Sequence, residues 1–394
     1  RQMCIRDSFE GMGANATSIS LSSAFFGCED LASVPAGLFD PIETKVTNIS
    51  NCFKNCTSLK SIPEGFGNSL TALTNASNAF YGCEALESLP SEMFKGAAAK
   101  LSNLSSMFSG CTSLKSVPDG LFGFIAARNA NFLNCFSACT SLKSVGADVF
   151  PSTVSTTGLN NTFSGCTSLT DISGKVFSKC ANVTTLMRTF YGCTALEALP
   201  SDLFAGMVKV TKFDQTFSGC TSLESIPEDL FSKNTVVNSF TKMFYECASI
   251  KAIPAGLFAN NKNAKDFNNM FYKCTSLTSV PEGLFTSCTA AQNFSYLFSG
   301  CTGIKTIPAG LFSSCKSAYD FSQTFAGCSS LQEIPEGLFD AVPSNNTNVK
   351  FPYCFASCTS LKTIPAALFD KALKASKFDY AFAGCTGLTG ESPY

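Results

Sequence analysis

One phrase of fifteen residues recurs along nearly the whole chain. "FSGCTSLESIPEDLF" begins at Phe217, and close variants begin at Phe108, Phe271 and Phe325. The cysteine within the pattern F-x-x-C occurs fourteen times, mostly at intervals of 27 residues, with one interval of 30 before Cys358. A unit of this length cannot bury an apolar face alone and is stabilised by stacking on its neighbours, so the spacing predicts a solenoid.

Positions within each unit are numbered here from this cysteine, taken as position 0, with negative numbers toward the N-terminus. Phe occupies position −3 in all fourteen units and position +11 in twelve of thirteen, where Phe66 lies one residue early. Position −7 is Leu, Ile or Phe in thirteen units, with Ala76 as the exception. We therefore expect equivalent side chains of successive coils to stack into continuous columns in a dry interior.

The segment before the cysteine has a helical pattern. Phe294, Leu297, Phe298 and Cys301 fall at i, i+3, i+4 and i+7, which predicts a two-turn helix. Gly at position −1 in nine units suits a left-handed helix end. Position −8 is Asn or Asp in half of the units, and such side chains accept bonds from free N–H groups of a first helical turn. These residues are Asn48, Asn75, Asn103, Asn131, Asp266, Asn293 and Asp320.

The segment after the cysteine, typified by "TSLKSIP", has apolar residues at +3 and +6 and usually ends in Pro. We expect a short strand closed by the proline, whose missing N–H breaks no ladder bond at a strand end. "PEGLF" is then a tight turn or a single helical turn. The whole pattern predicts an α/β, right-handed solenoid of about 14 coils, each of about 27 residues with a short strand and a short helix.

The phrases "F-x-G-C-T-S-L-K-S-I-P" and "I-P-x-G-L-F" resemble leucine-rich repeats, and more narrowly the BspA-like leucine-rich-repeat surface proteins. The resemblance covers Phe9 to about Gly390. This chain departs from the family in its longer unit and in the Phe that replaces Leu in the main apolar column. The resemblance implies a secreted or surface-exposed protein that binds other proteins, matrix or cell surfaces, and it implies no reaction.

The two ends depart from the repeat. Residues 1–8, "RQMCIRDS", read as a foreign leader similar to translated adapter sequence, with a divergent terminal repeat as the alternative. The expected organisation is this leader, a single leucine-rich-repeat solenoid over residues 9–390, and a truncated tail at residues 391–394.

Composition narrows the possible functions. The chain contains no histidine, which removes Ser-His and Cys-His nucleophile pairs and histidine metal ligands. Lys and Arg (28) nearly balance Asp and Glu (29), and no basic run points to nucleic acid. No apolar run is long enough to span a bilayer. We expect no enzyme activity, no cofactor, and a monomeric protein.

The 21 cysteines invite a disulfide or metal interpretation. Fourteen form position 0, three lie at −4 and three at +14, where other units carry Ile, Leu or Met. This substitution pattern predicts buried free thiols that act as small apolar groups. A few disulfides, with Cys288 and Cys315 the first candidates, and a metal site remain as lesser alternatives.

Position +4 is the candidate binding stripe, because it lies beside the apolar anchors of the expected strand and carries charged side chains. The stripe comprises Lys60, Glu87, Lys115, Lys143, Glu197, Glu224, Lys251, Lys305 and Lys362. The remaining units carry Ala, Thr or Gln at this position. The alternative is a solubilising surface with weak Lys–Glu pairs. As a ligand site, the specific parts are the Lys115–Lys143 and Glu197–Glu224 stretches.

Three functional classes remain open. The first is a non-catalytic scaffold for protein–protein interaction or adhesion at a cell surface, with a protein or matrix ligand. The second is a structural spacer or stalk of a larger surface protein. The third is a thiol-based metal or redox protein, which needs a cleft that breaks the regularity. The one notable irregularity is the polar insertion at residues 341–352, "AVPSNNTNVKFP", which is interpreted as a surface bulge.

Overall fold

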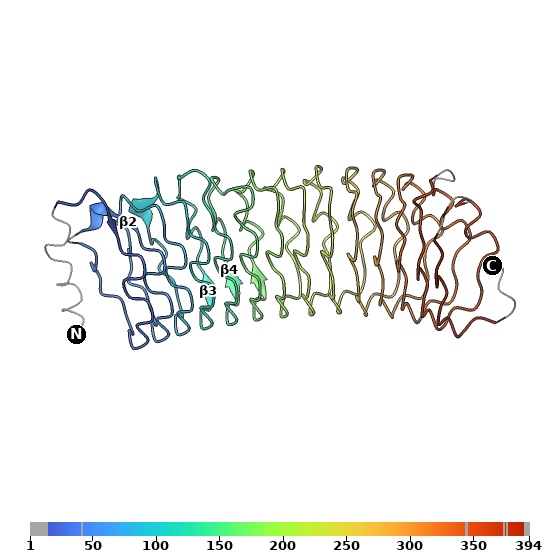
Figure 1. Ribbon diagram of the computed structural model, residues 1–394, viewed down its shortest axis with the longest axis horizontal. Helices are drawn as coiled ribbons and strands as arrows, with labels where there is room; N and C mark the ends of the chain where they lie inside the picture. The colour runs from blue at the N-terminus through green and yellow to red at the C-terminus, as the bar shows by residue number, and fades with distance from the viewer. Residues whose placement is uncertain (1–14, 41, 343–345, 373–374, 376, 390–394) are drawn as a thin grey trace. The chain divides into compact units, whose positions relative to one another are not determined.

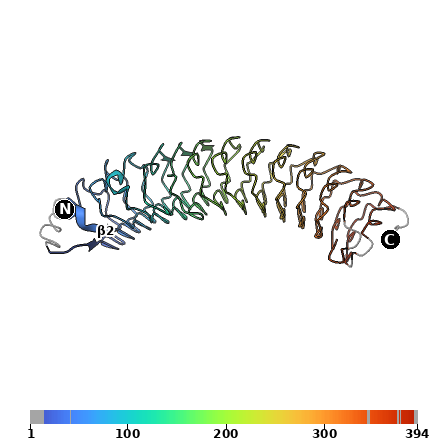
Figure 2. The same cartoon turned by 90° about the horizontal axis from the view of Figure 1, so that it is seen from above.

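A computed structural model describes residues 15–40, 42–342, 346–372, 375 and 377–389. The chain forms two compact units, residues 1–194 (unit 1) and 195–394 (unit 2). Within each unit, successive coils lie side by side in chain order (Figures 1 and 2). The expected leader at residues 1–8 and the tail at residues 391–394 lie outside the described residues, and a single solenoid over 9–390 stays a prediction.

Regular secondary structure is sparse in both units. Unit 1 holds the strands β1 (Ile19–Ser20), β2 (Val46–Asn48), β3 (Ser116–Val117), β4 (Ser144–Val145) and β5 (Asp171–Ile172), and the 3₁₀ helices η1 (Glu43–Lys45) and η2 (Lys95–Ala97). β1 pairs with β2, and β3, β4 and β5 form a sheet in that order, all in parallel. In the described part of unit 2, pairing is confined to isolated parallel bridges.

The Phe column at position −3 runs unbroken through each unit. In unit 1, neighbouring rings from Phe25 to Phe190 lie 5.2–5.6 Å apart at interplanar angles of 1–11°. In unit 2, rings from Phe217 to Phe382 lie 5.4–5.8 Å apart at 3–17°. Equivalent rings therefore stack face to face, as the repeat predicts, at separations favourable for offset aromatic pairs.

Unit 2 contains two further aromatic columns. Position −7 is Phe from Phe213 to Phe378, and position +11 is Phe from Phe204 to Phe369. Rings of the two columns meet at steep angles, for example Phe267 with Phe285 at 4.9 Å and 68°. Position −7 in unit 1 is mostly aliphatic, so its core has fewer aromatic columns.

The prediction of a two-turn helix is wrong. The segment from −7 to 0 is a run of reverse turns, with bonds from the N–H of Leu297 to the carbonyl of Phe294 and from the N–H of Cys301 to that of Phe298. Tyr296 and Gly300, at positions −5 and −1, have φ of 57° and 74°, which ends any right-handed helix. Two consecutive four-residue turns bury the same i, i+3, i+4 and i+7 positions as a helix, so the buried face is as expected although the backbone is not.

These turns satisfy the backbone by sharing bonds between coils. The N–H groups at −7, −5, −3 and −1 donate to carbonyls of the next coil, as in Phe298 to Thr324 at 2.8 Å. The N–H groups at −4, −2 and 0 donate three residues back within their own coil. Most amides of the segment are thereby satisfied, as the burial of a non-helical segment requires.

Left-handed residues occupy both −5 and −1 in all fourteen units. Such a conformation costs a residue with a Cβ roughly 1–2 kcal/mol, which explains why Gly is so frequent at −1. The expected left-handed conformation of these glycines is thus confirmed, but within a turn instead of at a helix end. Five units place another residue there: Asn55, Ala138, Glu246, Lys273 and Ser357.

All seven Asn and Asp residues at −8 accept a bond from the N–H two residues later. The Asn293 Oδ1 bond to the Ser295 N–H, at 3.0 Å, is typical. They cap the first reverse turn as Asx turns. The expected bond to a free N–H is therefore present, but it caps a reverse turn and not a helix. Their backbones also bridge adjacent coils in parallel, as in Asn293 with Asp320.

Strands after the cysteine occur where expected but are short. β3, β4 and β5 cover positions +5 and +6, and bridges join Ser33 with Ser61 and Ser279 with Thr306 at the same places. The segment that corresponds to "PEGLF" forms a turn, as in "PAGLF" at 308–312, where the N–H of Leu311 is bonded to the carbonyl of Pro308. The class is therefore a turn-and-strand solenoid, and the α/β description with a short helix in each coil is incorrect.

Exchange of Ala and Gly at position −1 tests the left-handed column. Ala138→Gly removes a strained Cβ and should raise the free energy of unfolding by about 1 kcal/mol. Gly165→Ala, one coil later, should lower it by about the same amount, because its new Cβ meets only ordinary contacts of 3.6 Å or more. Urea unfolding followed by circular dichroism measures both. Ala85→Gly, at a position with negative φ, is the control and should lower the free energy of unfolding. A loss of stability in Ala138→Gly would contradict the left-handed conformation of residue 138.

Candidate functional site

The stripe at position +4 is exposed and held in place by the backbone. All nine candidate residues are exposed. The N–H of each stripe residue donates to the carbonyl of its predecessor where both lie in one unit, as in Lys143 to Lys115 at 2.8 Å and Lys251 to Glu224 at 3.2 Å. The structure therefore brings two groups of stripe residues together as direct neighbours, at the spacing of a parallel ladder: Lys60, Glu87, Lys115 and Lys143 in unit 1, and Glu197, Glu224 and Lys251 in unit 2. Lys305 and Lys362 are not direct neighbours of another stripe residue, because Thr278 and Gln332 lie between.

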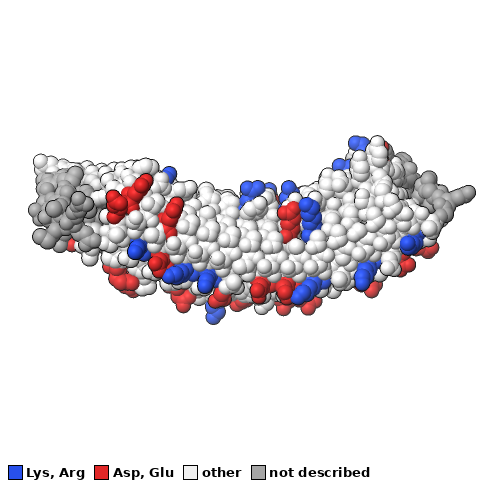
Figure 3. Space-filling view, turned by 90° about the horizontal axis from the view of Figure 1, so that it is seen from below, with Lys and Arg blue, Asp and Glu red and all other residues white. Residues whose placement is uncertain are grey.

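Charges within the stripe are partly compensated. Lys115 lies 2.5 Å from Glu87, and Lys251 lies 2.7 Å from Glu224. The hydrogen bond and charge of Lys115 lower the pKa of the Glu87 carboxyl. Lys143 has no ion-pair partner among the described residues, so the stretch Glu87–Lys115–Lys143 carries one unbalanced positive charge. Acidic and basic side chains run together along one edge of the face drawn in Figure 3, and wide areas beside them carry none.

The Thr residues at position +1 have a structural role. The hydroxyls of Thr140, Thr167 and Thr194 each donate to the +1 carbonyl of the preceding coil, at 3.2–3.5 Å. Thr275 and Thr359 do the same in unit 2. These hydroxyls join coils, so the expected polar surface beside the stripe is in part a bonding element.

The cysteines at position 0 also join coils. The thiol of Cys301 donates to the carbonyl of Phe271 at 2.9 Å, and the same bond to the −3 carbonyl of the preceding coil recurs in both units at up to 3.3 Å. The −3 carbonyl thus accepts both a backbone amide and a thiol. Cysteine suits this position because it is small, apolar and a weak donor.

Burial holds most of the thiols in their neutral form. All twenty described cysteines are free, and each except Cys28 is buried. Burial raises the pKa of Cys56 to about 11 and those of Cys166 and Cys301 to about 12. Because the thiolate is the form that binds metal and attacks electrophiles, burial makes these thiols unreactive in the folded protein. Cys385, in the last coil, differs, because a hydrogen bond with the Cys358 thiol lowers its pKa to about 7. The described residues contain no cluster of three Cys, Asp or Glu that could hold a metal ion.

A stacked pair of half-buried tyrosines on the turns was not anticipated from the sequence. Tyr245 and Tyr272, both at position −2, stack at 4.7 Å, with Lys242 5.6 Å from the first ring and Lys273 5.2 Å from the second. Lys273 also pairs with Glu246 at 3.5 Å. The signal in the sequence that could have revealed these contacts is the tyrosine at position −2, which varies between units.

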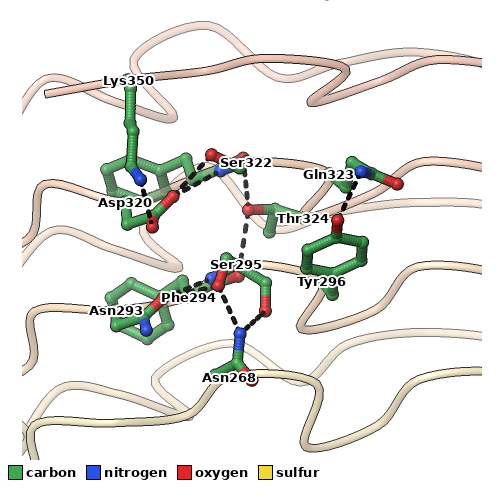
Figure 4. A network of polar contacts seen from close by, with 11 residues as sticks. Asn268, Asn293, Phe294, Ser295, Tyr296, Asp320, Ser322, Gln323, Thr324 and Lys350 are labelled. Atoms are coloured by element: carbon green, nitrogen blue, oxygen red, sulfur yellow. Dashed lines mark hydrogen bonds and ion pairs between the residues drawn. The ribbon is translucent and has the colours of Figure 1, made fainter.

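The insertion at residues 341–352 adjoins a depression that the sequence did not predict. The depression has a volume of about 380 Å³ and is lined by Tyr319, Asn346, Thr347, Asn348, Lys350 and Lys377. Lys350 lies 2.9 Å from Asp320, whose carboxylate also accepts bonds from Ser322 (Figure 4).

Comparisons with known proteins agree with the repeat geometry. Residues 19–119 and 279–390, together more than half of the chain, match the family described as BspA type leucine rich repeat region, in six copies. The chain belongs to the BspA-type leucine-rich repeat family. Residues 157–283 match a family described as Mycoplasma protein of unknown function. No curated protein sequence matches the chain. No helix of the described residues is long and apolar enough to cross a membrane.

Solved structures include similar bacterial leucine-rich repeat proteins. One from Bacteroides ovatus is 19% identical, with a TM-score of 0.41, over 94% of this chain and 80% of the other. One from Eubacterium ventriosum is 14% identical, with a TM-score of 0.37, over 89% and 82%. A leucine rich cell surface protein from Faecalibacterium prausnitzii is 17% identical, with a TM-score of 0.29, over 91% and 75%. At TM-scores below 0.5, these likenesses do not bear on the function of this BspA-type chain.

Thiol reactivity tests the role assigned to the cysteines. In a Cys4→Ser variant, a disulfide reagent at neutral pH should modify Cys28, which is exposed, and Cys385, whose pKa is lowered to about 7, before the other thiols. The remaining eighteen buried thiols should react only on unfolding, because burial disfavours the thiolate. Titration of folded and of denatured, unreduced protein measures both populations. Far fewer than twenty thiols after denaturation, or rapid reaction of many in the folded state, would contradict free and buried cysteines.

Proposed function

We propose that this chain is a non-catalytic scaffold that binds a protein or matrix ligand at a cell surface through the stripe at position +4. The observation that carries the proposal is the backbone ladder beneath the stripe. It fixes exposed charged side chains at regular spacing, so little order has to be gained when a partner binds. The proposed surface location and adhesion rest on the family to which the chain belongs. The proposed state is a monomer, which leaves the whole stripe accessible to a partner.

Specificity is proposed to reside where stripe charges are unbalanced. In unit 1, Lys143 lies next to the Lys115–Glu87 pair and has no ion-pair partner among the described residues. An acidic group of a binding partner would form an ion pair with Lys143. In unit 2, Glu197 precedes the Glu224–Lys251 pair and would accept a basic group. Exposed pairs of this kind each contribute at most about 1 kcal/mol, so they select and orient a partner more than they hold it.

Charge reversal in unit 1 tests the stripe. Binding of the protein to a panel of immobilised purified matrix and cell-surface proteins is measured by surface plasmon resonance. Lys115→Glu with Lys143→Glu should weaken binding to any captured partner about tenfold and reduce its salt dependence, since two favourable charges become unfavourable. The control reverses Lys95, which is paired with Glu92 at 2.8 Å, and Lys100, which forms no ion pair with any residue that the structure describes.

The control variant, like the stripe variant, reverses one lysine that forms an ion pair and one that does not, and both of its lysines lie outside the stripe. It should leave binding unchanged. Equal weakening by both double variants, or no effect of the stripe variant, would remove the stripe as a binding surface. Binding to none of the panel would favour the alternative of a spacer or stalk.

A further inference from the structure

We propose that the depression beside the insertion binds a sugar that carries a carboxylate, of the uronic or sialic acid class. The site is lined by Tyr319, Asn346, Thr347, Asn348, Lys350 and Lys377 and is independent of the stripe. At about 380 Å³ it is within the size range of small-molecule sites and suits one monosaccharide unit.

The insertion forms this site without disturbing the core. The interval between Cys328 and Cys358 is 30 residues instead of 27, and the added length lies between Phe339 and Phe351. Phe351 still stacks on Phe321 at 5.3 Å and 9°, as regular coils do. The extra residues are therefore accommodated at the surface, where Asn346 and Asn348 form one wall of the depression.

Charge in the depression is one positive unit out of balance. Asp320, Lys350 and Lys377 occupy position −8 of three successive coils and are joined by parallel bridges. Asp320 compensates Lys350 at 2.9 Å. Lys377 is exposed and has no ion-pair partner among the described residues, and Asp379 in its own coil forms none with it. A carboxylate placed at Lys377 would compensate this charge.

Lys350 is held in position before any ligand binds. The Asp320 side chain that pairs with it is 12% exposed and accepts bonds from the Ser322 N–H at 3.0 Å and hydroxyl at 2.6 Å (Figure 4). The Tyr319 carbonyl accepts the N–H of Lys350 at 2.9 Å, which fixes the tyrosine beside the lysine. Preorganisation of this kind lowers the entropic cost of binding.

The remaining lining favours a sugar over a simple anion. Asn346, Thr347, Asn348 and Tyr319 bring amide and hydroxyl groups, which donate to and accept from sugar hydroxyls. No Val, Leu, Ile or Met lines the depression, so an apolar peptide side chain would find only the Tyr319 ring and the lysine stems to pack against. One unbalanced positive charge matches a monoanion such as a carboxylate better than the dianion of phosphate.

Ligand-observed NMR and isothermal titration test the site, with glucuronate and N-acetylneuraminate as probes. At least one should bind saturably at millimolar concentration, and Lys377→Gln should weaken it by about fivefold or more. Lys377 has no partner to lose, so this variant should keep the melting temperature of the wild type. Lys212→Gln, at the same −8 position in a coil without the insertion, should bind as the wild type does.

The sugar and charge requirements are tested separately. Glucose should not bind detectably, and inorganic phosphate and acetate should bind more weakly than the sugar acids. Asn348→Ala should weaken the sugar acids and leave acetate unchanged. Absence of sugar-acid binding, equal binding by Lys377→Gln, or equally tight binding of acetate or phosphate would each overturn the proposal. None of these outcomes depends on a partner for the stripe.

Discussion

The structure depends on hydrogen bonds from every second amide of the turn segment to the next coil. Residues −7, −5, −3 and −1 can aim their N–H groups outward only if −5 and −1 are left-handed, and all fourteen units meet this condition. The same geometry places the −3 rings of neighbouring coils 5.2–5.8 Å apart, as in Phe25 with Phe53 and Phe217 with Phe244. Backbone and core therefore share one spacing between coils, which the inter-coil hydrogen bonds set.

Side chains at fixed positions complete the inter-coil bonding. The position 0 thiol, the +1 hydroxyl and the −8 amide or carboxylate each satisfy a specific backbone group, so the repeated "GCTS" phrase is explained by bonding within the fold. Residues that the fold does not use, such as those of the stripe at +4 and of the insertion, are free to vary and to contact ligands.

Much of this could be predicted from the sequence, because stacking makes every column visible as a periodic residue type. The Phe columns, the buried cysteines, the turn at "PEGLF" and the capping role of residues such as Asn293 all follow from that periodicity. The backbone of the segment before the cysteine was mispredicted as a helix, because two consecutive turns bury i, i+3, i+4 and i+7 as a helix does. The left-handed residues at −5, such as Tyr296 and Arg188, are not recognisable from their residue type as glycine is. The depression near Lys377 escaped prediction because it needs the relative placement of two coils and an insertion.

The most direct test of the account is the order of ring contacts along the −3 column. Selective labelling of Phe rings allows nuclear Overhauser effects to be measured between residues one unit apart. Phe298 should show contacts with Phe271 and with Phe325, whose ring centroids lie 5.6 and 5.7 Å away, while Phe271 and Phe325 show none with each other. Absence of both contacts to Phe298, or a direct contact between Phe271 and Phe325, would contradict stacked coils.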